Sequence, residues 1–140
     1  MGLELYMVGV IIEDMPRAVE FYRRLGLDIP EGSETKFHVE VKMGNMTFFL
    51  TTKRANARWD PARSDASGGY RIILEFYLKT REAVDAKYAE MIGYGYHGHV
   101  APYEVTPELY FAMIDDPDGN TILLSAFLGE AADNAAGEAR

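Results

Sequence analysis

One stretch of sequence decides the fold: Ile12-Glu13-Asp14-Met15-Pro16-Arg17-Ala18-Val19-Glu20-Phe21-Tyr22, which closes on Leu25-Gly26. A related stretch follows about 65 residues later, as Thr80-Arg81-Glu82-Ala83-Val84 with Tyr88 and Met91-Ile92-Gly93. Each copy comes after an apolar, strand-like run and is typical of a short amphipathic helix that stops at glycine. The spacing predicts two similar modules in tandem. Two half-sheets placed side by side would form a cupped surface that can hold a small molecule.

The first module is expected to contain three strands, over residues 5–12, 37–43 and 46–52. Apolar, β-branched or strictly alternating residues mark each of them. The Gly44-Asn45 pair supplies a tight turn between the second strand and the third. A helix over 15–25 follows the first strand, with Asp14 as its N-cap and Gly26 as its end.

The second module is expected to contain strands over residues 70–78, 98–103, 110–115 and 121–127, with a helix over 82–91 after the first strand. The pentapeptide Asp116-Pro117-Asp118-Gly119-Asn120 turns the chain into the last strand. Residues 1–128 are therefore predicted to form one domain, with modules at about 4–52 and 70–128 and a polar linker over 53–69. Residues 129–140 have little to bury and are expected to be a disordered acidic tail.

A two-residue turn at Gly44-Asn45 would pair residue 43 with 46, 40 with 49 and 38 with 51. One face of the first sheet would then carry Met7, Gly9, His38, Glu40, Lys42, Thr47, Phe49 and Thr51. The opposite face, packed on the helix, would carry Val8, Val10, Ile12, Phe37, Val39, Val41, Met43, Phe48 and Leu50. In the second module Arg71, Ile73, Glu75, Tyr77, Phe111 and Met113 would take the open face, and Ile72, Leu74, Phe76, Ala112 and Ile114 the helix face. The open faces could form a mixed ligand site or could simply be solvated.

Composition limits the classes of protein that fit. A chain of 140 residues with 48% hydrophobic residues is long enough for one domain with a core. It has no cysteine, no apolar run of membrane-spanning length and no recognisable secretion signal, which together suit a cytoplasmic protein. The net charge of −8 argues against nucleic-acid binding. It is consistent with a cationic ligand, and equally with solubility alone.

The sequence resembles the vicinal-oxygen-chelate superfamily, which includes glyoxalases, bleomycin-resistance proteins and extradiol dioxygenases. The resemblance rests on Glu13-Asp14, on Ala18-Val19-Glu20-Phe21-Tyr22 with Leu25-Gly26-Leu27, and on Asp116-Pro117-Asp118-Gly119-Asn120-Thr121-Ile122-Leu123. It implies an α+β fold of two tandem βαβββ modules that form an open, cupped, barrel-like mixed sheet with helices outside. It also implies a homodimer, if the chain follows the bleomycin-resistance branch.

The resemblance also implies four inward-facing metal positions, which here are Met7, Phe49, Arg71 and Leu123. The enzymes of the family place His, Gln or Glu at these positions. A thioether, a phenyl ring, a guanidinium and an isobutyl group do not supply the oxygen and imidazole donors of such a site. We therefore expect neither a metal at the family positions nor a cofactor.

The remaining polar and aromatic residues suggest binding more than catalysis. His38 and Glu40 could act as an acid–base pair or could be polar residues that line a site. The motif His97-Gly98-His99 could place two rings on one face, but the sequence offers no evident carboxylate partner for a metal. Trp59, in the linker, could stack on a ligand or cover an apolar patch. The residues expected to bind ligand are His38, Glu40, Phe49, Trp59, Arg71, Glu75, Phe111 and Met113.

Together these features predict a metal-free binding protein that sequesters a planar aromatic natural product or antibiotic, which could be cationic, in the manner of self-resistance proteins. The alternative is a lyase, isomerase or dioxygenase of the same fold, with a metal held by relocated ligands such as His38, Glu40, Glu75, His97 or His99. A third alternative is a non-catalytic relative that serves assembly or regulation. The fold alone does not choose between these activities.

Overall fold

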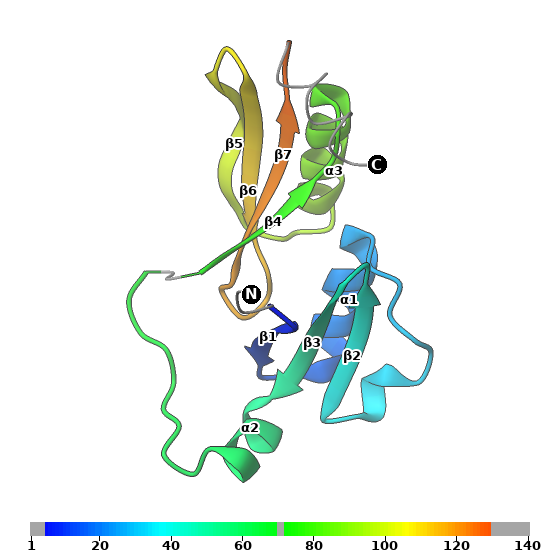
Figure 1. Ribbon diagram of the computed structural model, residues 1–140, viewed down its shortest axis with the longest axis vertical. Helices are drawn as coiled ribbons and strands as arrows, with labels where there is room; N and C mark the ends of the chain where they lie inside the picture. The colour runs from blue at the N-terminus through cyan, green and yellow to red at the C-terminus, as the bar shows by residue number, and fades with distance from the viewer. Residues whose placement is uncertain (1–4, 70–71, 130–140) are drawn as a thin grey trace, which may run out of the picture. The chain divides into compact units, whose positions relative to one another are not determined.

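The computed structural model describes residues 5–69 and 72–129, and the chain divides into two compact units, Met1–Gly69 and Tyr70–Arg140 (Figure 1). We call these unit 1 and unit 2. Within the described residues the fold is α+β, with three α-helices and two mixed sheets. The predicted tail lies, except for Gly129, outside the described residues. No helix in those residues is long and apolar enough to cross a membrane.

Unit 1 is built on a three-stranded sheet. Its elements are β1 (Met7–Ile12), α1 (Met15–Leu25), the short 3-10 helix η1 (Ser33–Thr35), β2 (His38–Met43), β3 (Met46–Thr52) and α2 (Lys53–Trp59). The strand order is β1-β3-β2, in which β1 runs parallel to β3 and β2 antiparallel to it. The predicted pairing of residues 43, 40 and 38 with 46, 49 and 51 is confirmed. The turn residue Gly44 has a φ of +61°, a region that favours glycine.

Unit 2 is built on a four-stranded sheet. Its elements are β4 (Ile73–Tyr77), α3 (Arg81–Gly93), β5 (Gly98–Thr106), β6 (Leu109–Asp115) and β7 (Thr121–Phe127). The strand order is β4-β7-β6-β5, with β4 parallel to β7 and the other pairs antiparallel. Unit 1 has the same order without a counterpart of β5 in its described residues. The family resemblance implied four strands in each module, and unit 2 has them, whereas the described residues of unit 1 contain the three strands that its own sequence predicts.

In unit 1 the segment between α1 and η1, where a fourth strand would lie, does not form a strand. The segment after α1 contains Pro30, which has no N–H to donate, and Gly32, whose φ is +81°. Arg23 donates side-chain hydrogen bonds to the carbonyl oxygens of Ile29 and Pro30, the latter at 2.7 Å. These carbonyls are therefore paired with a helix side chain and not with a neighbouring strand.

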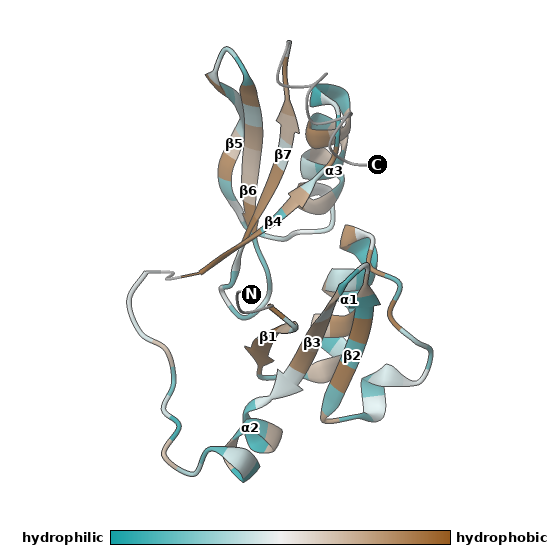
Figure 2. Cartoon of the chain, in the orientation of Figure 1, coloured by the Kyte–Doolittle hydropathy of each residue, from teal (hydrophilic) through white to brown (hydrophobic). Residues whose placement is uncertain are grey.

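The helix α1 forms as its end signals predict. The Asp14 carboxylate accepts a hydrogen bond from the Arg17 N–H at 2.8 Å, and Gly26 ends the helix with a φ of +128°. Its buried face packs on the sheet, where the Tyr22 ring lies 5.3 Å from that of Phe48. The predicted inner residues Val10, Ile12, Val39, Val41, Phe48 and Leu50 are buried. Figure 2 shows the corresponding alternation of apolar and polar residues along β2.

Three residues predicted for the helix-facing core are largely exposed instead. Phe37 precedes β2 and is 53% exposed, under the guanidinium of Arg54, and Met43 at the hairpin turn is 38% exposed. Ile72 precedes β4 and is 73% exposed. All three lie at or beyond strand ends, where alternation continues in the sequence but the helix no longer covers the sheet. In unit 2 Ala112 and Ile114 are fully buried on the side of α3, as predicted, whereas Leu74 and Phe76 are only half-buried.

The helix α2 lies in the segment that was expected to be only a linker. The Thr52 hydroxyl accepts a hydrogen bond from the Ala55 N–H at 3.1 Å, as in a side-chain N-cap. The Lys53 ammonium contacts Glu13 at 3.1 Å and Asp65 at 3.4 Å, and these carboxylates raise its pKa. The capping residue is visible in the sequence, but the helix has only seven residues, too few to show a helical period.

One hydrogen bond ties the sheet of unit 2 to its helix. The hydroxyl of Tyr110 on β6 donates to the Asp85 carboxylate on α3, and the Arg81 guanidinium lies 4.5 Å from the Tyr110 ring centre. The hydrogen bond to Asp85 raises the pKa of the tyrosine hydroxyl. Because the folded protein then keeps this proton to higher pH than the unfolded chain, the interaction stabilises the fold below about pH 10 and is lost as pH rises further.

We expect Tyr110→Phe to lower the free energy of unfolding by about 1 kcal/mol at neutral pH, since one partly buried hydrogen bond is lost. Above about pH 10 the wild-type protein should lose stability faster than the variant, so that the two curves converge. Urea unfolding of both proteins at neutral and alkaline pH measures this. A constant difference across the range would contradict the assignment.

Candidate ligand-binding site

The centre of the open face of unit 1 is a phenyl ring packed on a glycine. Residues Gly9, Phe49 and Glu40 form one row across β1, β3 and β2. The Phe49 ring lies so close over Gly9 that a β-carbon on Gly9 would collide with three ring atoms. Glycine at this position therefore lets the ring lie flat against the strand, on the face opposite α1.

His38 and Trp59 extend this surface. The His38 ring centre lies 5.0 Å from that of Phe49 and 6.1 Å from that of Trp59, to which it is nearly perpendicular. Nε2 of His38 lies 3.0 Å from Oε2 of Glu40. Trp59 is 56% exposed, an unusual state for a large indole. We call Phe49, His38, Trp59 and Glu40 the unit 1 aromatic surface.

Local structure fixes the members of this surface. His38 and Glu40 are alternate residues of β2, and Phe49 stands opposite Glu40 on β3. Trp59 is the last residue of α2, whose first turn is held by the Thr52 cap and by the ion pairs of Lys53. Four of the eight residues predicted to bind ligand are therefore brought together in one unit.

Three further predicted residues lie on one face of the sheet of unit 2. Glu75 pairs with Leu123 on β7, which in turn pairs with Met113 on β6. The buried Ser125 hydroxyl donates a 2.7 Å hydrogen bond to Glu75, and the Phe111 ring packs edge-on against Tyr103 at 5.4 Å. The eighth predicted residue, Arg71, lies outside the described residues.

Three of the four family metal positions can be examined for donor chemistry. Met7 and Phe49 share the open face of unit 1, and Leu123 is buried in unit 2. A thioether is a soft ligand, and the other two side chains have no donor atom, so this set does not fit a hard divalent cation. The residues at these positions cannot hold the metal that the family fold implies.

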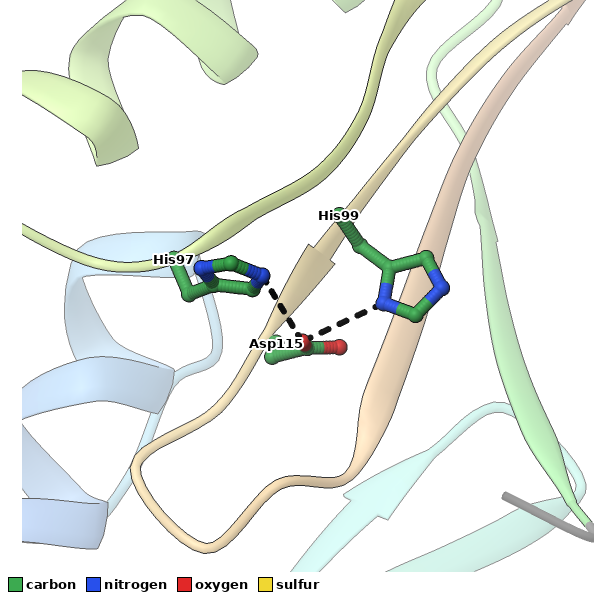
Figure 3. A group of neighbouring side chains, drawn as sticks. All are labelled: His97, His99 and Asp115. Carbon is green, nitrogen blue, oxygen red and sulfur yellow. Dashed lines mark hydrogen bonds and ion pairs between the residues drawn. The ribbon is translucent and has the colours of Figure 1, made fainter. Parts of the chain in front are cut away.

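A different group of donors lies together in unit 2 (Figure 3). The carboxylate of Asp115 lies between the rings of His97 and His99, and the donor atoms of all three residues are within 4.8 Å of one another. The expectation that this histidine pair has no carboxylate partner is wrong. The partner is 16 residues from His99 and is brought beside it by the pairing of β5 with β6.

Three residues that shape these surfaces were not among the predicted site residues. An isolated glycine in a strand pattern, as at Gly9, is a usable sign of close approach by another group. Ser125 gave no comparable signal, because its hydrogen bond to Glu75 depends on how β4 and β7 pair. Asp115 directly precedes the turn motif in the sequence, and nothing there indicates its contact with the two histidines.

Comparisons with known proteins agree with this architecture. The family model for the glyoxalase/bleomycin resistance protein/dioxygenase superfamily matches residues 5–124. A glyoxalase/bleomycin resistance protein/dioxygenase family enzyme from Burkholderia phytofirmans PsJN is similar in structure, with 24% identity, a TM-score of 0.78 and coverage of 90% of this chain and 100% of that one. A search of curated proteins gave no match.

Two other solved structures are similar over most of the chain. A glyoxalase/bleomycin resistance protein from Albidiferax ferrireducens T118 is 28% identical, with a TM-score of 0.66 and coverage of 87% of this chain and 97% of that one. Lactoylglutathione lyase from Agrobacterium tumefaciens is 20% identical, with a TM-score of 0.66 and coverage of 88% and 92%. The second likeness concerns the fold alone.

Proposed function

The chain belongs to the glyoxalase/bleomycin resistance protein/dioxygenase superfamily, and from this premise we propose that it binds and sequesters a planar aromatic small molecule. The observation that carries the proposal is the unit 1 aromatic surface, in which two rings and an imidazole gather on the open face of the sheet. No bond is broken in this function, and protection comes from holding the toxic compound.

The chemistry of the surface favours a flat ligand. Aromatic rings attract one another in offset or edge-on arrangements at the separations found here, and each such pair contributes about 0.5–1.5 kcal/mol beyond the buried area. The exposed indole of Trp59 and the half-buried ring of Phe49 are available for such contacts. Backing by Gly9 keeps Phe49 in place before the ligand arrives, which reduces the entropy lost on binding.

The charges of the surface favour a neutral or cationic ligand over an anion. The Glu40 carboxylate lies beside the rings, with its side chain 49% exposed, and the whole chain carries a net charge of −8. A ligand cation beside Glu40 would gain Coulomb energy. His38 supplies a hydrogen-bonding nitrogen, and no metal ion bridges protein and ligand in this proposal. On unit 2, Glu75 and Phe111 offer a second mixed surface beside Met113, which is buried, and Arg71 completes the predicted set.

We also propose that the protein works as a cytoplasmic homodimer of the self-resistance type, with each binding groove completed by the second copy. Analytical ultracentrifugation at micromolar concentration measures the mass directly. A monomer over the whole concentration range would contradict this part of the proposal and leave the aromatic surface to be tested by itself.

The direct test is a fluorescence titration of chelator-treated protein through Trp59, the only tryptophan of the chain. The probes are a bleomycin-like glycopeptide, a mitomycin-like quinone, an anthraquinone and a flavin. We expect saturable quenching by at least one probe. Calorimetry with Trp59→Phe, Trp59→Ala and Phe49→Leu should then show graded weakening, by about three- to tenfold when a stacking ring is removed.

Tyr94→Leu is the matched control, because it removes another exposed aromatic ring, 46% exposed, from the end of α3 in unit 2. Its affinity should equal that of the wild type. If no probe binds the chelated protein, or if the control loses as much affinity as Trp59→Ala, sequestration by this surface is wrong.

One observation favours a second candidate function, a metal-dependent lyase, isomerase or dioxygenase. His97, His99 and Asp115 provide the three-donor group that such an enzyme would need away from the family positions. Turnover of a small oxygenated substrate that occurs only with added metal, and that is lost in His97→Gln, would select this candidate. Glu40 and Glu75 would then be polar lining residues.

A further inference from the structure

Two strands and one loop of unit 2 bring imidazole and carboxylate groups to a single point (Figure 3). Nδ1 of His99 lies 3.2 Å from Oδ2 of Asp115, and Nε2 of His97 lies 3.7 Å from the same oxygen. The three donor atoms all lie within 4.8 Å of one another. We propose that His97, His99 and Asp115 form a binding site for a divalent transition-metal ion such as Zn²⁺, with one coordination position left open.

The donor spacing suits a tetrahedral ion. With metal–ligand bonds of about 2.0–2.2 Å, neighbouring donors of such an ion lie roughly 3.3–3.6 Å apart. The two contacts to Asp115, at 3.2 and 3.7 Å, lie just below and just above this spacing, so small side-chain movements bring both into it. The third separation, between the two imidazoles, is at most 4.8 Å, and it can shorten by rotation of the His97 ring, because that side chain is 72% exposed. Two imidazoles with one carboxylate is a donor set that selects transition metals over Mg²⁺ or Ca²⁺.

The backbone of β5 has a bulge at His99, which turns the His99 side chain toward Asp115. Gly98 pairs with Ile114 and Val100 with Met113, so β5 has one extra residue, His99, between two successive pairs. Such a bulge redirects a side chain relative to regular alternation. The neighbouring Gly98 faces α3, where a β-carbon would collide with the Tyr88 hydroxyl. The glycine therefore lets β5 approach the helix while the flanking histidines meet at Asp115.

The carboxylate is oriented by a group outside the donor set. The hydroxyl of Thr121, which is buried, donates a 2.9 Å hydrogen bond to Oδ1 of Asp115. The other oxygen, Oδ2, is the one that faces both histidines. The backbone N–H of Asp115 also donates to the carbonyl of His97 at 3.0 Å, which fixes the two residues side by side. Outer hydrogen bonds of this kind hold metal ligands in place and strengthen binding.

The site shares no residue with the unit 1 aromatic surface or with the positions that the family uses. All its residues belong to unit 2, and none of Met7, Phe49, Arg71 or Leu123 is part of it. It therefore adds a function to the chain that holds whether or not the aromatic surface binds a ligand. The overall charge of −8 raises the local concentration of cations around the protein.

The test is a calorimetric titration of the untagged, full-length chain with Zn²⁺ after removal of bound metal. We expect one zinc ion per chain, with affinity at least about tenfold lower in His97→Gln, in His99→Gln and in Asp115→Asn. His97→Gln is the most informative variant. Because the His97 side chain is exposed, its replacement should not unfold the protein, so weaker zinc binding would reflect loss of a metal ligand. His38→Gln is the matched control, since it removes the histidine of another His–carboxylate pair, and it should leave zinc binding unchanged.

A second readout uses the small number of histidines. The chain has only three, so their imidazole resonances can be assigned in NMR spectra by the three substitutions. Zinc should shift the resonances of His97 and His99 and leave those of His38 in place. Absence of saturable zinc binding, wild-type affinity in His97→Gln, or an equal effect of His38→Gln would overturn the proposal. Trp59→Phe should weaken binding of the aromatic ligand but leave zinc affinity unchanged. The zinc proposal can therefore fail while the sequestration proposal holds, and the reverse.

Discussion

Replacing Asp116 by alanine is expected to lower the free energy of unfolding by about 3 kcal/mol, a large effect for one side chain. One carboxylate oxygen of this buried residue accepts the N–H groups of Asp118 and Asn120 at 2.9 and 2.8 Å, and the other accepts the Asn120 amide at 2.8 Å. The Asp116 backbone donates to the Asn120 carbonyl at 2.9 Å and accepts from Gly119, which has a φ of +84°. Alanine would leave partly buried donors of the turn without their acceptor.

Urea unfolding of Asp116→Ala beside Asp116→Asn and Asp28→Ala measures this effect. In Asp116→Asn the side-chain oxygen can still accept from the backbone N–H groups, but its NH2 group would face the NH2 group of Asn120, and both are donors. We therefore expect a loss of unfolding free energy between those of the wild type and of Asp116→Ala. Asp28 is exposed, and its substitution by alanine removes the same charge with little effect. Equal stability of Asp116→Ala and Asp28→Ala would show that the turn is held by other contacts.

Gly9→Ala is expected to destabilise the protein by about 2 kcal/mol and to weaken binding of a planar ligand. The added β-carbon would occupy the place of the Phe49 ring, so the ring must leave its position on the strand. In a strand without this ring, alanine would instead be favoured over glycine by roughly 0.5–1 kcal/mol, because glycine loses more backbone freedom on folding.

The sign of the effect is therefore expected to reverse in a Phe49→Ala background, where the collision is absent. Unfolding of the wild type, both single variants and the double variant forms a double-mutant cycle that isolates the coupling between the two residues. A Gly9→Ala effect that is the same in both backgrounds would mean that Phe49 does not lie on Gly9. The binding titration with the same four proteins tests whether that ring position matters for the ligand.

Local signals in the sequence predicted much of each unit. The register of the β2–β3 hairpin followed from Gly44-Asn45, since a two-residue turn leaves only one pairing that keeps Val39 and Leu50 on the buried face. The ends of α1 followed from Asp14 and Gly26, because a cap acts on the backbone within a few residues. Errors arose at strand ends, as at Phe37 and Ile72, where a pattern cannot tell how far the covering helix reaches.

The candidate site was predictable only in part. The alternation of residue types along β2 and β3 is sufficient to place His38, Glu40 and Phe49 on one face. The reach of Trp59 to His38 depends instead on α2, a short helix that composition did not reveal. The unit 1 sheet also lacks a fourth strand in its described residues, because Arg23 takes carbonyl groups of the segment that would have formed it.

The sequence by itself determined the strands, the helices α1 and α3, most of the sheet faces and the family of this protein, because periodicity, caps and turn residues act over distances of a few residues. Only the tertiary structure decided which distant groups meet. Asp115 stands beside His97 and His99 because β5 and β6 pair with a bulge at His99, and the Thr121 hydroxyl holds it there. Such contacts depend on the register of the whole hairpin. A bulge of one extra residue in one strand changes which residues stand opposite each other, and the pattern of residue types along the sequence does not reveal it.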